Sequence, residues 1–301
     1  MRDRIAAIDF GTNTARLLIA DRNADGSLVH IHLEREIVRM GGGFTRDQGL
    51  SRDALERGLC CLSRFAAIMR EYGDMQLRAV ATSAVRDAIN GHAFVEQVRQ
   101  ETGISLSIIN GTTEGALTLV GVLAGLDQKY NEMLLFDIGG GSTEYTLAQG
   151  GAVQFTRSLP LGVVRLTEGK VTPDAMQEKI SRELDALWQE LELTGFRANK
   201  CIPLIGTAGT ATTIAAISME MTDYDYRKVN NVTVSQAKIR DIYERLLPLS
   251  LEERLRIPGL EKGREDLIVA GLLITLNTME MFGIDTLKVS DYGLLEGLIV
   301  Q

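Results

Sequence analysis

One short pattern occurs twice in the chain, and it constrains the fold more than any other feature. Residues 5–20 read IAAIDFGTNTARLLIA, and residues 133–148 read MLLFDIGGGSTEYTLA. Both copies pass from an apolar strand through Asp-x-Gly and a small polar turn into a second apolar strand. The overlaid copies match at three pairs of positions: Asp9 with Asp137, Gly11 with Gly139, and Thr14 with Ser142. A duplicated supersecondary unit predicts two similar domains that face one another.

Strand-like and helix-like segments alternate along both halves, which predicts an α/β fold with mixed sheets and flanking helices. The apolar pattern is interrupted by GLDQKYNE at residues 125–132. We therefore expect one domain over residues 1–125 and a second over 126–301. The last helix, over residues 292–300, is expected to pack back on the first domain.

Several elements are specific enough to be tested. Residues 51–73 predict an amphipathic helix with Ser51 as N-cap and Gly73 just past its C-terminus. Its apolar stripe consists of Leu55, Leu59, Leu62, Ala66 and Met69. Other predicted elements include a strand running into a loop over 77–87, short strands over 105–110 and 200–206, and a helix over 263–283.

Composition excludes several classes of protein. The 301 residues are 45% hydrophobic and 24% charged, as in a soluble globular protein, and the net charge of -8 argues against binding duplex nucleic acid or an anionic membrane. The three cysteines (Cys60, Cys61 and Cys201) have no disulfide or CxxC spacing, and three histidines are too few for a His-rich metal site. The first residues, MRDRIAAIDFG, reach a polar turn too early for a secretory signal, and we expect a cytoplasmic protein. LIVAGLLITL at 267–276 has about half the length that a membrane-spanning helix needs, so we expect it to be a core helix.

The glycine-rich turns are the strongest candidates for chemistry. Glycines between an aspartate and a Ser or Thr allow several backbone N–H groups to turn inward and hold phosphate oxygens. Asp9 and Asp137, at strand ends, are placed to position a hydrated magnesium ion on those phosphates. GTAGT at 206–210 adds a turn before a helix, which is a further anion site. The alternatives are a structural hairpin and a compact strand–helix connection, and the duplication favours phosphate binding for the first.

Two charged side chains have equally open interpretations. Arg86 follows a predicted strand, where it either clamps phosphate or lies solvated on the surface. Glu114 lies in the first turn of a predicted helix, where the helix dipole alone favours an acid. Its functional interpretation is a general base that takes a proton from water attacking a terminal phosphate.

Taken together, these residues resemble the exopolyphosphatase and guanosine pentaphosphate phosphohydrolase family of the actin-like ATPase superfamily. The resemblance covers essentially the whole chain through seven blocks: AAIDFGTNTARLLIA, ATSAVRDAING, DIGGGSTE, SLPLGVVRLTE, GTAGT, PGLEKGREDLIVAGLLI and VSDYGLLEGLI. It implies two actin-like (ribonuclease H-like) domains with a cleft between them. It also implies hydrolysis of the terminal phosphoanhydride of polyphosphate or guanosine pentaphosphate with magnesium.

The resemblance assigns roles residue by residue. It implies catalytic roles for Glu114, Asp137 and Glu144, with Asp137, Glu144 and Asp9 near the metal. The phosphate-binding residues that it implies are Asp9, Gly11, Thr12, Asn13, Arg86, Gly139, Gly140, Gly141, Ser142, Gly206 and Gly209. Another divalent ion, added potassium and a homodimer are compatible with the same resemblance.

Departures from the family pattern concern the substrate. Thr113 and Ala116 stand where the family has an acid and an arginine, and Tyr292 and Leu295 replace a glycine and an arginine. The loss of two arginines would weaken a site for long polyphosphate. The chain resembles the short two-domain form, without the helical HD-type domain of longer members.

Three functions remain open from sequence. Polyphosphate hydrolysis leads, guanosine pentaphosphate hydrolysis is the close runner-up, and a non-catalytic regulator that binds an alarmone or nucleotide is the third. A sugar-kinase function is weaker, because nothing in the chain suggests a sugar-binding insertion.

Overall fold

The chain forms two compact units, which consist of Met1–Ala124 with Gly293–Gln301, and of Gly125–Tyr292. The computed structural model describes residues 3–45, 47–169, 172–197 and 202–301. Cys201 and the start of the strand expected over 200–206 lie outside the described residues. The chain passes from one unit to the other at two points, between Ala124 and Gly125 and between Tyr292 and Gly293.

The first unit is built on a five-stranded sheet with the strand order β3-β2-β1-β4-β5. Its strands are β1 (Asp3–Phe10), β2 (Thr14–Arg22), β3 (Leu28–Ile37), β4 (Gln76–Ala81) and β5 (Ser107–Ile108). Its helices are α1 (Arg52–Glu71), α2 (Ser83–Arg86), α3 (Gly91–Thr102), α4 (Gly111–Gly125) and α12 (Leu294–Val300). β1, β2 and β3 pair antiparallel, whereas β4 and β5 continue the sheet parallel to β1.

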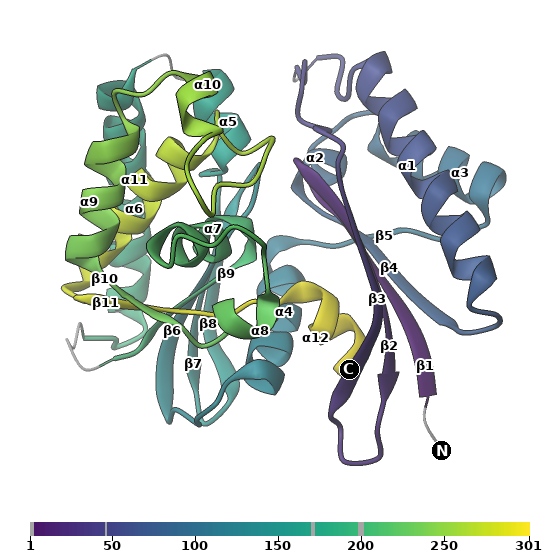
Figure 1. Cartoon of the computed structure of the whole chain (residues 1–301), viewed down its shortest axis with the longest axis horizontal. Coiled ribbons are helices and arrows are strands. Elements are labelled where there is room, and N and C mark those ends of the chain that lie inside the picture. Colours follow the sequence, from purple (N-terminus) through teal and green to yellow (C-terminus); the bar gives the residue numbers. More distant parts are fainter. Residues whose placement is uncertain (1–2, 46, 170–171, 198–201) are drawn as a thin grey trace. The chain divides into compact units, whose positions relative to one another are not determined.

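Alternate residues of β1 and β2 face two apolar clusters, one on each side of this sheet. In Figure 1, α1 and α3 lie on one side of this sheet and α12 on the other. Phe10 and Leu17 pack with Phe65 in the cluster on the α1 and α3 side, whereas Ile5 and Leu18 pack in the cluster on the α12 side. Because the sheet is covered on both faces, residues 5–8 of β1 and 17–20 of β2 form continuous apolar runs, as the sequence pattern indicated. The C-terminal helix α12 is therefore part of the first unit.

The helices α4 and α12 of the first unit meet at glycines. A Cβ on Gly121 would lie 1.8 Å from the carbonyl oxygen of Gly293, and a Cβ on Gly297 would lie 1.9 Å from that of Leu117. Backbone atoms cannot move aside as a side chain can, so Gly297→Ala is expected to destabilise the protein by about 1–3 kcal/mol through overpacking. Chemical denaturation measures this free energy.

The control for that substitution is Gly169→Ala in the other unit, where a Cβ would meet nothing within 4 Å. Alanine is a better helix former than glycine. A Gly297→Ala variant as stable as the Gly169→Ala variant would show that the close α4–α12 contact does not limit stability.

The second unit repeats the arrangement in a six-stranded sheet with the order β10-β11-β9-β6-β7-β8. Its strands are β6 (Glu132–Ile138), β7 (Thr143–Gln149), β8 (Ala152–Leu159), β9 (Leu204–Thr207), β10 (Thr233–Ser235) and β11 (Thr286–Val289). Its helices are α5 (Val163–Gly169), α6 (Pro173–Leu193), α7 (Ala208–Ser218), α8 (Tyr226–Val229), α9 (Gln236–Leu246), α10 (Leu251–Arg254) and α11 (Ile268–Phe282).

In both units three antiparallel strands are followed by two that run parallel to the first strand. In the second unit these are β8-β7-β6 and then β9 and β11, with β10 added antiparallel to β11. This is the ribonuclease H-like strand order expected of actin-like domains, found twice (Figure 1). The predicted fold class is confirmed.

The ends of α1 are confirmed, and its predicted apolar stripe packs against the core as expected. Ala54 donates its N–H to the Ser51 hydroxyl at 3.3 Å, and Gly73 has a φ of 80°. Leu62 is fully buried, and the other four stripe residues are partly buried and pack against the same core cluster. The fully buried face of α1 extends beyond the stripe to Ala54, Gly58, Cys61 and Phe65. Gly58 has no side chain, so the rings of Phe10 and Phe94 approach the helix there and turn that face inward.

Three other elements differ in extent from their predictions. The predicted loop after β4 contains the helical turn α2, the strand over 105–110 is only two residues long, and α11 begins at Ile268 rather than 263. As predicted, α11 is a core helix, with twelve of its 15 residues buried.

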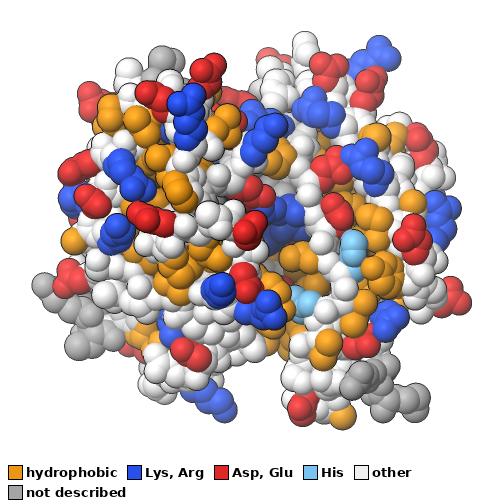
Figure 2. Space-filling model, viewed as in Figure 1, with side chains coloured by type: hydrophobic (Ala, Val, Ile, Leu, Met, Phe, Trp, Pro, Cys, Tyr) orange, Lys and Arg blue, Asp and Glu red, His pale blue; other side chains and the backbone are white. Residues whose placement is uncertain are grey.

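None of the described helices is long and apolar enough to cross a membrane. On the face shown in Figure 2, described basic and acidic side chains are interspersed.

Candidate active site

The two repeated hairpins fold alike, residue for residue. In the β1–β2 hairpin Asp9 lies directly opposite Arg16, and in the β6–β7 hairpin Asp137 lies directly opposite Glu144. Each turn is closed by the same backbone hydrogen bond. Its length is 3.1 Å from Gly11 N to Thr14 O and 2.9 Å from Gly139 N to Ser142 O.

The partner of the aspartate distinguishes the two hairpins chemically. Arg16 donates from Nη2 to the Asp9 carboxylate at 2.6 Å and from Nε at 3.1 Å, both to Oδ2. Asp9 is 7% exposed, and a buried carboxylate is stable only when it is paired. The first hairpin thus contains its own counter-charge, which sequence analysis missed. Asp9 lies two residues before the first residue of the turn and Arg16 two residues after its last, and this symmetric spacing in the sequence could have revealed the pair.

The second hairpin places two carboxylates side by side instead. Asp137 and Glu144 are 7% and 2% exposed. Residues directly opposite in an antiparallel pair have Cβ atoms about 5 Å apart, and like charges there repel. A bound cation relieves that repulsion, and carboxylate oxygens are the ligands that Mg²⁺ prefers.

A magnesium ion fits this carboxylate pair. Among the described residues, no group of three or more His, Cys, Asp or Glu side chains could hold a metal ion. Mg²⁺ usually takes one or two protein carboxylates and completes its octahedral shell with water and phosphate oxygens. Asp137 and Glu144 would therefore hold the ion, with the remaining positions left to water and substrate.

The turn between these carboxylates presents N–H groups in one direction. The carbonyl of Gly139 accepts from Val163 N at 3.0 Å, and that of Gly140 accepts from Val164 N at 2.9 Å, at the start of α5. In a planar trans peptide the C=O and the following N–H point in opposite directions. The N–H groups of Gly140 and Gly141 therefore point away from α5, and within the described ranges neither donates to a backbone carbonyl. Successive N–H groups so arranged form an anion-binding concavity.

Gly162, directly before α5, allows this turn to pack closely against the start of that helix. Sequence analysis did not predict this role for Gly162. A Cβ on Gly162 would lie 2.2 Å from the Gly140 carbonyl oxygen and 2.3 Å from the carbonyl carbon of Gly141. Only glycine allows the turn to approach so closely.

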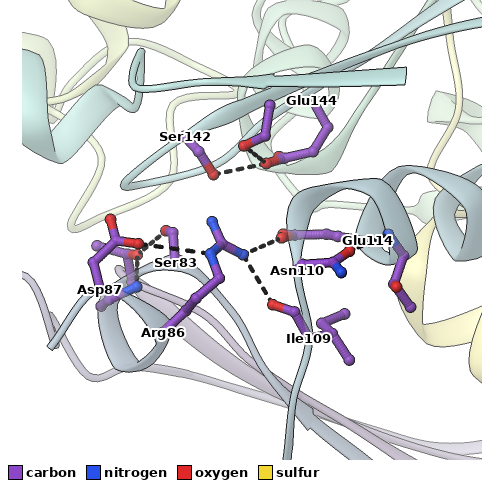
Figure 3. A network of polar contacts seen from close by, with 12 residues as sticks. Ser83, Arg86, Asp87, Ile109, Asn110, Glu114, Ser142 and Glu144 are labelled. Atoms are coloured by element: carbon purple, nitrogen blue, oxygen red, sulfur yellow. Dashed lines mark hydrogen bonds and ion pairs between the residues drawn. The ribbon is translucent and has the colours of Figure 1, made fainter. Parts of the chain in front are cut away.

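Ser142 and Glu144 of the second hairpin are linked directly (Figure 3). The Ser142 hydroxyl donates to Glu144 Oε1 at 2.8 Å, and the Ser158 hydroxyl on β8 donates to the same oxygen at 2.6 Å. Ser158 is a further residue that sequence analysis missed.

The glycines of the β9–α7 turn have different structural reasons. A Cβ on Gly206 would lie 2.9 Å from Phe136 Cζ and Leu287 Cδ1, so Gly206 makes room for the core. A Cβ on Gly209 would lie 2.0–2.4 Å from the guanidinium of Arg264. Because Gly209 has no side chain, the Arg264 guanidinium has room to lie beside the start of α7. Arg264, which also donates to Glu261 at 3.0 Å, adds a positive charge at a helix N-terminus.

The first unit carries the predicted base. Glu114 lies in the first turn of α4 and is 7% exposed. Arg86, at the end of α2, donates from Nη1 to Glu114 Oε2 and to the Ile109 carbonyl, both at 3.1 Å (Figure 3). The Thr12 hydroxyl accepts from Ala84 N at 3.1 Å, so the first glycine turn anchors the helical turn that carries Arg86.

The neighbour of Thr12 in the same turn has an unsatisfied polar atom. Asn13 is 6% exposed, and its Oδ1 has no hydrogen-bond partner in the part of the chain that the structure describes. Its backbone carbonyl accepts from Val38 N and Arg39 N at 2.9 Å. Buried polar atoms are normally hydrogen-bonded, so Asn13 Oδ1 fits a donor such as a water held by a cation.

Two of the departures from the family pattern turn out to be packing residues. Leu295 is 2% exposed in the apolar cluster beneath α12. The Tyr292 ring lies against the backbone of Gly125, where a Cβ would be 2.4 Å from its Cγ. Leu295, which stands where the family has an arginine, is therefore a core position in this chain.

Comparison with known proteins decides the family. The model of the Ppx/GppA phosphatase family matches residues 18–301. The chain belongs to the Ppx/GppA phosphatase family. The matched range includes the second glycine turn, at residues 139–142, with Asp137 and Glu144 beside it.

Three relatives illustrate the similarity to other Ppx/GppA proteins. A bifunctional 3-dehydroquinate synthase/phosphatase of Fusobacterium nucleatum is 32% identical over 98% of this chain, which spans 46% of that protein. Exopolyphosphatase 2 of Mycobacterium tuberculosis is 32% identical over 99% of this chain and 98% of its own. The structure of the Aquifex aeolicus PPX-GPPA enzyme superposes with a TM-score of 0.81 at 33% identity, covering 100% of this chain and 99% of that one.

Proposed function

We propose that the protein hydrolyses the terminal phosphoanhydride bond of inorganic polyphosphate with magnesium and releases orthophosphate. The observation that carries this proposal is the β6–β7 hairpin. The N–H groups of Gly140 and Gly141 suit an anion, whereas the neighbouring Asp137 and Glu144 suit a cation. A magnesium-bound phosphate meets both requirements at once.

The relatives support the choice of substrate. A protein named exopolyphosphatase matches this chain over almost the full length of both. We place the magnesium ion at the Asp137 and Glu144 pair rather than at Asp9. The Asp9 carboxylate already has a counter-charge, because it forms an ion pair with Arg16. When bound, Mg²⁺ would neutralise phosphate charge that builds up in the transition state.

The reaction assigns the remaining groups. Glu114 takes a proton from water as the water oxygen forms a bond to the terminal phosphorus. The bond from that phosphorus to the bridging oxygen breaks, and its electron pair stays on the shortened chain. Arg86 holds the Glu114 carboxylate in place, and the N–H groups of the second turn bind oxygens of the terminal phosphate.

One assay tests the proposal. Purified protein with magnesium is given polyphosphate, guanosine pentaphosphate, or ATP with a sugar, with and without potassium, and orthophosphate and products are measured. Release from polyphosphate is expected, and chelation of magnesium should abolish it. Faster release from guanosine pentaphosphate would make that nucleotide the substrate. Binding of guanosine tetraphosphate without any turnover would indicate a regulator, and sugar phosphorylation would indicate a kinase.

A further inference from the structure

Glu144 lies at the centre of a row of polar side chains that crosses three strands. It is opposite Asp137 on β6 and opposite Ser158 on β8, in register with both. Directly opposite side chains project from the same face of a sheet. The row therefore joins the carboxylate pair to an edge strand that contributed nothing to the site predicted from sequence.

Two hydroxyl groups hold one oxygen of Glu144. Ser142 and Ser158 donate to Oε1 at 2.8 and 2.6 Å. The torsion that turns a glutamate carboxylate is broad and poorly defined on its own. Two donors on one oxygen fix the plane of the carboxylate, and so fix the direction of Oε2.

The two donors differ in what happens when substrate binds. Ser142 belongs to the phosphate turn, where a bound phosphate oxygen competes with Glu144 for its hydroxyl. Ser158 is paired within the β7–β8 ladder, next to the pair formed by Thr143 and Leu159. Its hydroxyl is therefore a donor to Glu144 that does not depend on the substrate.

We propose that Ser158 is a positioning residue for the reaction, which orients the Glu144 carboxylate toward the magnesium ion and its water. This inference rests on the proposed function, which supplies the ion and the water. Partners that orient a metal-binding side chain typically affect metal affinity or turnover, even though they touch neither metal nor substrate.

The test compares Ser158→Ala with Ser158→Thr and a matched control. Threonine keeps the hydroxyl and suits a strand. The control is Thr156→Ala, two residues earlier on β8, which loses a hydroxyl contact of 2.5 Å with Thr146 on β7. Thr156 lies opposite Thr146 rather than Glu144, so its loss weakens the same strand pair without touching the carboxylate.

Ser158→Ala is expected to lower kcat about tenfold, with KM for polyphosphate nearly unchanged. Magnesium affinity without substrate, measured by isothermal titration calorimetry, should also fall about tenfold. Ser158→Thr should restore both values, and Thr156→Ala should leave both at the wild-type level. Thermal unfolding of all variants confirms that each is folded under the assay conditions.

Two results would overturn the inference. One is a Ser158→Ala variant with the kcat and magnesium affinity of Thr156→Ala, and the other is a Ser158→Thr variant that fails to recover. Because the magnesium titration needs no turnover, it tests Ser158 separately from the reaction. A wild-type protein that binds magnesium but hydrolyses no polyphosphate would refute the proposed function alone.

Discussion

Replacement of Glu114 by glutamine is expected to lower kcat for polyphosphate by about 10³-fold, the contribution typical of a general base. Glutamine has nearly the same shape, and its amide oxygen can still accept a hydrogen bond from Arg86, which now donates to Glu114 Oε2 at 3.1 Å. An amide cannot take the proton of the attacking water. Orthophosphate release at saturating substrate measures the loss, and equilibrium binding of polyphosphate should change little.

The control for Glu114→Gln is Thr113→Ala, one residue earlier in the same helical turn. Thr113 is exposed, and its backbone N–H bonds to Asn110 Oδ1 at 2.8 Å, a contact that alanine keeps. Its kcat should equal that of the wild type. A Glu114→Gln variant that retains a tenth or more of the wild-type kcat would show that another group accepts the proton.

The sequence predicted those parts of the fold that depend on local pattern. Both hairpins carry their strands and turn within 20 consecutive residues, so Asp9 and Asp137 could be placed at equivalent strand ends before the structure was known. The ends of α1 were predictable for the same reason, because a cap involves only neighbouring residues. The alternation of strands and helices likewise predicted the fold class.

The missed features depend on contacts between distant segments. Ser158 reaches Glu144 through the pairing of β7 with β8, and Gly162 reaches Gly140 through the packing of α5 on the turn. Arg264 meets Gly209 from 55 positions further along the chain. Periodicity describes one segment at a time, so it gives no register between segments. The burial of Gly58 in α1 was missed likewise, because the rings that occupy the space beside it come from other elements.

Substitution of Gly162 by alanine is expected to lower kcat about a hundredfold by moving the phosphate turn. The new Cβ would lie 2.2 Å from the Gly140 carbonyl oxygen, and this separation must grow by roughly 1 Å to become an ordinary contact. A misplacement of about 1 Å in a catalytic site can reduce the rate about 10²-fold. Because Gly140 and Gly141 point their N–H groups away from α5, the shift misaligns the donors of the phosphate site.

Overpacking at Gly162 should also lower stability by about 1–3 kcal/mol, so kinetics and unfolding must be measured together. Gly169→Ala, at the other end of α5, is the matched control, because its Cβ meets nothing within 4 Å. That variant should keep wild-type kcat and stability. If Gly162→Ala is destabilised yet turns over at the wild-type rate below its unfolding transition, the turn tolerates displacement. The N–H groups of Gly140 and Gly141 would then not be the donors that the reaction needs, and the anion would have to be bound elsewhere.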